Sequence, residues 1–205
     1  MSLVRPDDWW PQGIVDLEPN AWEALRQTTE SVLVTAGAGA GKTEFLAQKA
    51  TYLLQTGLCA APKRILAISF KRDAARNLAE RVAKRCPPEQ ARRFNSYTFD
   101  AFAKNLVDRF CAAIPEPYCP TTDYRIVTSS AQDYREFLTN YNFYGVDTQH
   151  FERKIATARL PIANEGSQIQ HAVAEYWHHQ YNDYDYVRLS FPMLNRLAEL
   201  LIRTN

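Results

Sequence analysis

The sequence predicts an α/β fold, with a parallel sheet and flanking helices followed by a smaller, mainly helical region. Short apolar runs at 31–35, 64–70 and 94–99 have the length and composition of strands. A segment with apolar residues at helical spacing follows each run. Because strands that alternate with helices form parallel sheets, these three pairs predict an α/β domain.

The bulk properties are those of an ordinary globular protein of one or two domains. The chain has 205 residues, of which 46% are hydrophobic and 23% are charged. No apolar run approaches the roughly 18 residues of a membrane helix, and the first residues lack the basic-then-apolar order of a signal peptide. The four cysteines show no CxxC spacing, which favours reduced thiols. We therefore expect a cytoplasmic protein with no membrane partner.

The first strand is expected between two helices. Residues 1–16 are predicted to form an irregular lead-in whose two tryptophans pack against the domain. A helix is expected over 20–27. The run at 31–35 is β-branched and apolar, as in a buried strand, and the helix that begins near Lys42 has a stop signal at Gly57.

The octet between this strand and this helix has the composition of a phosphate-binding loop. It reads A-G-A-G-A-G-K-T and matches G-x-x-x-x-G-K-[ST] at all but its first position. A loop that wraps phosphate aims backbone N–H groups inward, which small residues allow, and a helix dipole adds to those donors. The alternative is a glycine-rich turn that merely resembles such a loop. The nucleotide-binding candidates are Ala36, Gly37, Ala38, Gly39, Ala40, Gly41, Lys42 and Thr43, with Lys42 reaching the β- and γ-phosphates and Thr43 binding Mg²⁺.

A basic stripe lies within a chain whose net charge is only +1. Between residues 63 and 93 there are ten lysines and arginines but only three acidic residues. Such a stripe attracts polyanions, although a solvated helix face has the same appearance. The strand at 64–70 and a helix over 73–85 lie within it, and Asp100 is expected to cap the helix that follows the third strand.

The second part of the chain differs from the first in composition and in predicted secondary structure. Prolines at 115, 117 and 120 predict a linker, which separates residues 17–114 from a helical region over 115–205. This region is rich in tyrosine, which indicates either an aromatic core or a stacking surface for single-stranded bases. Three histidines on one segment have no Cys or carboxylate cluster at metal-ligand spacing, so we expect no metal there. Helices are predicted over 131–140, 149–159, 169–180 and 191–203.

Four segments together resemble one family, the superfamily 1 DNA helicases of the UvrD/Rep/PcrA and RecB group. The octet has the family's A-G-A-G-x-G-K-T form, and residues 65–82 resemble its motif Ia. Residues 97–103 are similar to motif Ib, and residues 17–25 to the Q motif. The resemblance is strong over 17–110, and the later residues resemble the 1B subdomain only by position and helical texture. It implies a P-loop NTPase (RecA-like) core over 17–114, of the 1A type and incomplete, followed by a 1B-like region.

The resemblance implies that ATP with Mg²⁺ binds at the octet, where Lys42 stabilises the transferring phosphoryl group. It also implies that Phe70, Lys71, Arg72, Thr98 and Phe99 contact single-stranded DNA or a single-strand/duplex junction. The residue types agree with this implication. Phe70 ends a strand at the carboxyl edge of the sheet, where a ring can stack on a base and the two cations after it can meet phosphates.

Three motifs depart from the family's pattern. Ala21 stands where the Q motif has the glutamine that reads adenine, so either adenine selectivity is reduced or another residue such as Gln27 supplies it. Lys71 and Arg72 replace the usual T-N of motif Ia. The H-S of motif Ib is Asp100-Ala101 here.

The acids that hold Mg²⁺ and orient the attacking water have no counterpart after Phe110. In the family these acids lie on a D-E-x-Q-D strand, and a second RecA-like domain follows. We therefore expect the N-terminal portion of a longer ATP-dependent helicase, with the remainder as its partner, and little ATP hydrolysis by these 205 residues alone. The alternative is a naturally short, non-enzymatic module that binds nucleotide or DNA as a regulator.

Overall fold

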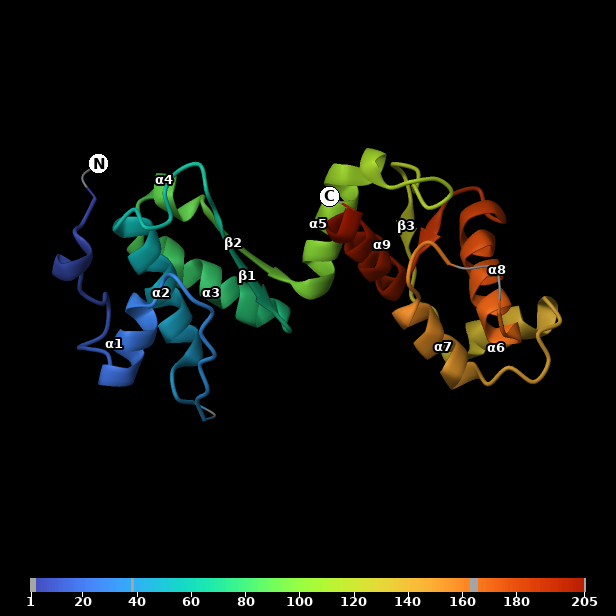
Figure 1. Cartoon of the computed structure of the whole chain (residues 1–205), viewed down its shortest axis with the longest axis horizontal. Helices are drawn as coiled ribbons and strands as arrows, with labels where there is room; N and C mark the ends of the chain where they lie inside the picture. The colour runs from blue at the N-terminus through green and yellow to red at the C-terminus, as the bar shows by residue number, and fades with distance from the viewer. Residues whose placement is uncertain (1–2, 38, 163–165, 205) are drawn as a thin grey trace. The chain divides into compact units, whose positions relative to one another are not determined.

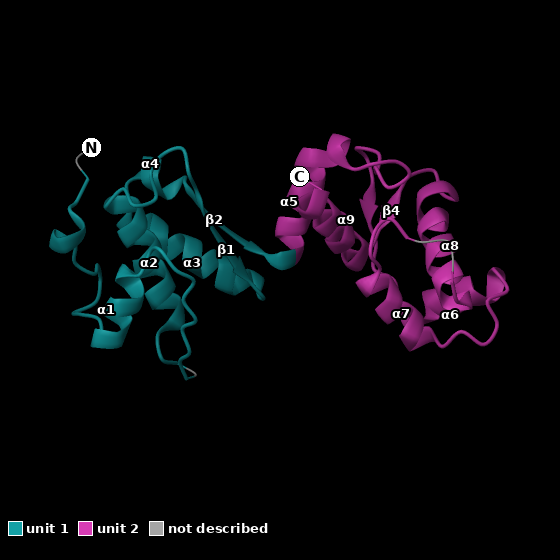
Figure 2. Cartoon of the chain, viewed as in Figure 1, with its two compact units in different colours: residues 1–99 teal, residues 100–205 magenta. Residues whose placement is uncertain are grey.

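The computed structural model describes residues 3–37, 39–162 and 166–204. The chain forms two compact units, residues 1–99 and 100–205 (Figures 1 and 2). The prolines predicted that the second region begins at 115, but the division falls earlier. The reason is that α5 (Phe99–Phe110) and the turn after it place Val107 and Ile114 in the core of the second unit.

The first unit contains a two-stranded sheet with helices packed on it (Figure 1). The helices predicted over 20–27, from Lys42 and over 73–85 are present, and so are the strands predicted at 64–70 and 94–99. In chain order, the elements are η1 (Pro6–Asp8), α1 (Pro19–Arg26), α2 (Lys42–Gln55), β1 (Ile65–Ser69), α3 (Arg72–Arg85), α4 (Pro88–Ala91) and β2 (Phe94–Thr98).

The two strands are parallel, with Ile65 opposite Phe94 and Ser69 opposite Thr98. One face of the sheet packs on a cluster that α2 and α3 contribute. The other face of β1 is uncovered, since Leu66 and Ile68 are each 46% exposed. The prediction of a buried parallel strand is therefore correct for one face only. The buried residues of the cluster are Ala47, Ala50, Leu54, Leu78, Val82 and Cys86.

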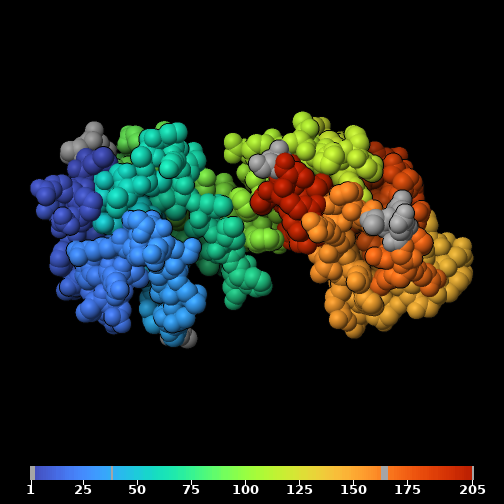
Figure 3. All heavy atoms as spheres, in the orientation of Figure 1, coloured from blue at the N-terminus to red at the C-terminus, as the bar shows by residue number. Residues whose placement is uncertain are grey.

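The predicted strand at 31–35 does not form. No residue of this run is in a strand, and Leu33 is 89% exposed, with Val32 and Val34 also exposed. The space-filling view shows the light-blue segment on the surface of the first unit (Figure 3). An apolar run becomes a buried strand only where neighbouring strands pair with it and helices cover it. Among the described residues of the first unit, β1 and β2 pair only with each other.

A second cluster fixes α1 and the lead-in against α2. Trp9 is 2% exposed and packs with Leu25 and Tyr52. Trp10 is 59% exposed but its ring lies 5.5 Å from that of Trp22, so both predicted tryptophans contact the domain and only Trp9 is buried. Lys49 of α2 donates to three carbonyl oxygens at the C-terminus of α1, including that of Leu25 at 2.7 Å. A cation there satisfies carbonyls that the helix leaves unpaired. Burial lowers the pKa of Lys49.

The second unit is mainly helical, as predicted, and each of the four predicted helices is present to within two residues. Asp100 lies in the first turn of α5 and not at its N-cap, because the helix begins one residue earlier, at Phe99. The remaining elements are η2 (Cys111–Ala113), β3 (Arg125–Ile126), α6 (Ala131–Asn140), α7 (Thr148–Thr157), α8 (Gln168–Asn182), β4 (Arg188–Leu189) and α9 (Phe191–Thr204).

Aromatic side chains form much of the core of the second unit. Phe137 stacks on Phe151 with ring centroids 5.8 Å apart, and Tyr134 and Tyr176 pack edge-on to Phe151. These two tyrosines are 3% exposed, whereas Tyr144 is 67% exposed. The core interpretation of the tyrosine-rich sequence is therefore confirmed for Tyr134 and Tyr176. In the part of the chain that the structure describes, no helix is long and apolar enough to cross a membrane.

Candidate functional site

The octet forms a turn that leads directly into α2. Gly39 and Gly41 have φ values of +77° and +73°, which only glycine adopts at little cost. A Cβ at Gly37, Gly39 or Gly41 would meet no atom within 4 Å, so backbone conformation is what requires glycine at the latter two positions. Of the eight predicted nucleotide-binding residues, Ala38 lies outside the described residues.

The Lys42 ammonium and the positive end of the α2 dipole lie where the turn meets the helix. Gly41 is the N-cap of α2 and Lys42 its first residue. The Lys42 ammonium donates to the carbonyl oxygens of Ala36 at 2.7 Å and Gly37 at 2.6 Å, so it lies over the loop. A helix leaves its first amides without intrahelical acceptors, and its dipole makes this end positive. This combination suits an anion, and Thr43 places a hydroxyl in the same turn.

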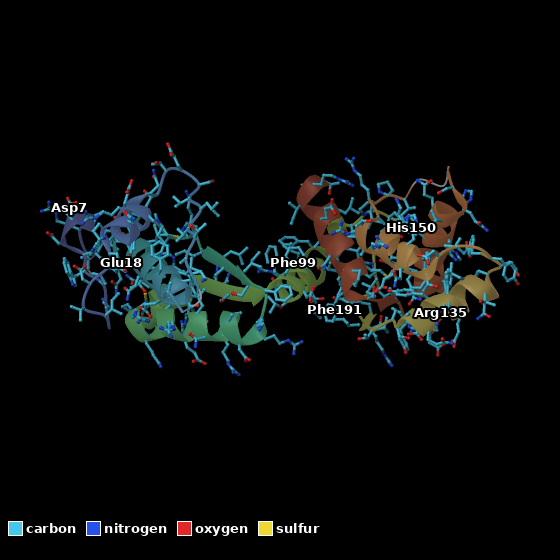
Figure 4. The ribbon with its side chains drawn as sticks, turned by 90° about the horizontal axis from the view of Figure 1, so that it is seen from below. Asp7, Glu18, Phe99, Arg135, His150 and Phe191 are labelled. Atoms are coloured by element: carbon cyan, nitrogen blue, oxygen red, sulfur yellow. The ribbon has the colours of Figure 1, made fainter. Side chains whose placement is uncertain are left out.

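A cavity of about 640 Å³ extends from the loop to α1. Its loop side includes Gly41 and Lys42, and its other side includes Asn20 and Ala21. Gln27, the suggested substitute for the missing adenine-reading glutamine, is not among the residues that line it. Its Oε1 accepts from the amide and the hydroxyl of Thr29. Asn20 is an amide that the sequence interpretation missed, although it directly precedes Ala21. The acids Asp16, Glu18 and Glu44 also line the cavity, and Glu18 is labelled in Figure 4.

The five predicted DNA-binding residues gather at the carboxyl edge of the sheet. Ser69 pairs with Thr98, so Phe70 and Phe99 leave adjacent parallel strands at the same edge. The Phe70 ring is 97% exposed and the Phe99 ring 54% exposed. Figure 4 labels Phe99 where β2 continues into α5. Large apolar side chains this exposed at a strand end mark a contact surface rather than a core.

Two cations accompany Phe70 at this edge. Lys71 is the N-cap of α3 and Arg72 its first residue, and both are exposed. They therefore lie at the positive end of a helix, where phosphate groups bind favourably. The geometry brings aromatic rings, cations and a helix N-terminus together, which are the components of a site for single-stranded nucleic acid.

Much of the basic stripe has structural partners. Arg76 pairs with Asp73 at 3.1 Å, and Arg93 donates to the backbone at Cys59 and Lys63. Arg81 and Arg85 of α3 both pair with Glu44 of α2. No local sequence signal indicates this pairing, because Glu44 precedes the arginines by 37 and 41 residues. The interpretation of a solvated face is therefore wrong for Arg81 and Arg85.

Asp183 of the second unit takes part in a hydrogen-bond network with two other side chains. Among the described residues, no group of three or more His, Cys, Asp or Glu side chains is arranged to hold a metal ion. Asp183 accepts from Tyr141 and contacts Nδ1 of His179 at 2.7 Å. These hydrogen bonds hold the pKa of Asp183 below its usual value and raise the pKa of Tyr141 to about 12. Asp183 thus belongs to a local network of the helical unit.

Comparison with known proteins agrees with this geometry. The family model for the UvrD/REP helicase N-terminal domain matches residues 17–198, which include the octet, both strands and most of the helical unit. The chain belongs to this family. The family match also extends through the second unit, where the sequence alone showed only a weak resemblance.

Individual relatives match about half of the chain. ATP-dependent DNA helicase PcrA of Leuconostoc citreum is 37% identical over 110 residues, which is 54% of this chain. DNA helicase IV and ATP-dependent DNA helicase Rep, both of Escherichia coli strain K12, are 35% and 33% identical over 48% of the chain. In each case the matched stretch covers 14% of the relative's own length.

Proposed function

We propose that this chain is the ATP-binding N-terminal part of a DNA helicase that moves along single-stranded DNA. The observation that carries the proposal is the turn at 36–43, in which two left-handed glycines lead into a helix headed by Lys42 and Thr43. Such a turn presents amides, an ammonium and a hydroxyl to one anion. The relatives' names, which include ATP-dependent DNA helicases, support the same assignment.

The residues present suit a magnesium–nucleotide complex. Lys42 would meet the β- and γ-phosphates, and the Thr43 hydroxyl would be one ligand of Mg²⁺. The cavity between Lys42 and Asn20 has room for the nucleoside. Bound Mg²⁺ supplies charge neutralisation during phosphoryl transfer.

Phe70 carries the proposed contact with DNA, and its replacement tests that contact. Phe70→Ala is expected to weaken binding of a single-stranded oligonucleotide about tenfold, because base stacking on one ring contributes ~1–3 kcal/mol. Fluorescence anisotropy with a labelled oligothymidine measures the change. Tyr144→Ala, which removes an exposed ring from the helical unit, is the matched control and should leave binding unchanged. Equal affinity of wild type and Phe70→Ala would refute the contact.

Hydrolysis is expected to need residues beyond these 205. The chain should bind Mg²⁺–ATP yet release phosphate no faster with single-stranded DNA than without it, because its sequence has no D-E-x-Q-D run to hold Mg²⁺ and orient water. A phosphate-release assay with and without oligonucleotide measures this. DNA-stimulated turnover at about 1 per second or more would contradict the expectation. A chain that binds ATP but no DNA would favour the non-enzymatic nucleotide-binding module.

A further inference from the structure

Glu44 occupies an unfavourable place for an acid in a phosphate-binding loop. It directly follows Thr43 in the first turn of α2 and lines the same cavity as Lys42. A carboxylate at a helix N-terminus is itself stabilised by the dipole. Here, however, its charge repels the polyphosphate that the turn is built to hold.

Two arginines of α3 enclose this carboxylate. Oε1 of Glu44 accepts from Arg85 at 2.8 Å and from the buried amide of Gln48 at 2.8 Å, and Oε2 accepts from Arg81. Both oxygens are therefore engaged, and the Glu44 side chain is only 19% exposed. Arg85 also donates to the carbonyl oxygen of Gln12 at 2.9 Å, which ties the lead-in to the same network.

The network carries more positive than negative charge. Two guanidinium groups face one carboxylate, so the cluster has a net charge of +1 beside the loop. The other charged groups that line the cavity are Lys42, Asp16 and Glu18. Arg81 is 40% exposed and Arg85 is 13% exposed, so Arg81 can be altered with less effect on packing.

We propose that Arg81 and Arg85 set the affinity of the phosphate loop for nucleotide by neutralising Glu44. This inference rests on the proposed nucleotide-binding function. The arginines act through Glu44 and are positioning residues of the site. Loss of one arginine leaves the cluster neutral, and a polyphosphate then meets a less positive loop. Loss of the Glu44 charge has the opposite effect.

A second substitution that restores the net charge of the cluster distinguishes this electrostatic role from a purely structural one. Arg81→Ala should weaken Mg²⁺–ATP binding about threefold to tenfold at low salt, and Glu44→Gln should strengthen it by a similar factor. The double variant has the net charge of the wild-type cluster and should return to within about twofold of its affinity. Arg76→Ala, on the same helix but paired with Asp73 and Glu80, is the matched control and should match wild type.

These differences in affinity are measured by isothermal titration of the full 205-residue chain with Mg²⁺–ATP, at 50 mM and at 500 mM NaCl. The differences should be smaller at the higher salt concentration because screening is stronger. Thermal unfolding without nucleotide shows whether each variant is folded. A double variant as weak as Arg81→Ala, or differences that persist at 500 mM NaCl, would overturn the inference. Absence of ATP binding by the wild type would instead refute the proposed function on which the inference rests.

Discussion

Replacing Arg85 by alanine should lower the free energy of unfolding of the first unit by about 2–3 kcal/mol. A nearly buried ion pair that loses one partner costs about 3–5 kcal/mol, because the remaining charge stays desolvated. The Arg85 side chain is 13% exposed and its partner Glu44 is 19% exposed. The expected loss falls below this range because Arg81 still holds the other oxygen of Glu44. Urea denaturation followed by circular dichroism measures the change.

Arg76→Ala is the matched control for this prediction. Arg76 lies on the same helix and is 72% exposed, with ion pairs to Asp73 and Glu80 that water screens. Its removal should change the free energy of unfolding by less than about 0.5 kcal/mol. If Arg85→Ala is no more destabilising than Arg76→Ala, the network does not hold α2 and α3 together.

The helices could be predicted because their signals are local. Apolar residues at helical spacing, with Gly57 as a stop signal after α2, mark where these helices lie. In the structure Ser130 is the N-cap of α6, where its side chain accepts from the Asp133 amide and the Asp133 side chain accepts from the Ser130 amide. Such contacts span three residues or fewer, so the sequence contains all the information that they need.

The errors of sequence interpretation concern contacts between distant residues. The run at 31–35 has strand composition, but a strand also needs a partner, and the sequence does not show whether one is present. The same limit applies to the position along the chain where the second unit begins, because the apolar face of α5 could pack on either unit. It packs through Val107 on the helical unit.

The candidate site depends on both local signals and contacts between distant residues. The octet is contiguous, so its residue types and order predict a phosphate loop directly. The carboxyl edge of the sheet brings Phe70 near Phe99, 29 residues later, and this could be anticipated only because both follow strands of one parallel sheet. The Glu44 network joins two helices by side chains alone. Charge counting over 63–93 therefore overestimated the cations that are available to a polyanion.

Replacing Lys42 by alanine should weaken Mg²⁺–ATP binding about tenfold to a hundredfold. The ammonium now lies between two loop carbonyls, and a phosphate group would accept its hydrogen bonds with the added attraction of opposite charge. A charge-assisted hydrogen bond of this kind contributes ~1.5–3 kcal/mol. Titration with a fluorescent ATP analogue measures the loss. The fold should be retained, because Lys42 is exposed.

Lys63→Ala provides the control, since Lys63 is an equally charged and exposed lysine outside the cavity. Its removal changes the net charge of the chain by the same amount, so any general electrostatic effect appears in both variants. The difference between them isolates the local contact of Lys42 with phosphate. If both variants bind ATP equally well, the turn at 36–43 does not hold the nucleotide, however closely its sequence resembles a phosphate loop. A specific loss with Lys42→Ala would instead place the phosphates at the head of α2, where the left-handed glycines, the helix dipole and the ammonium converge.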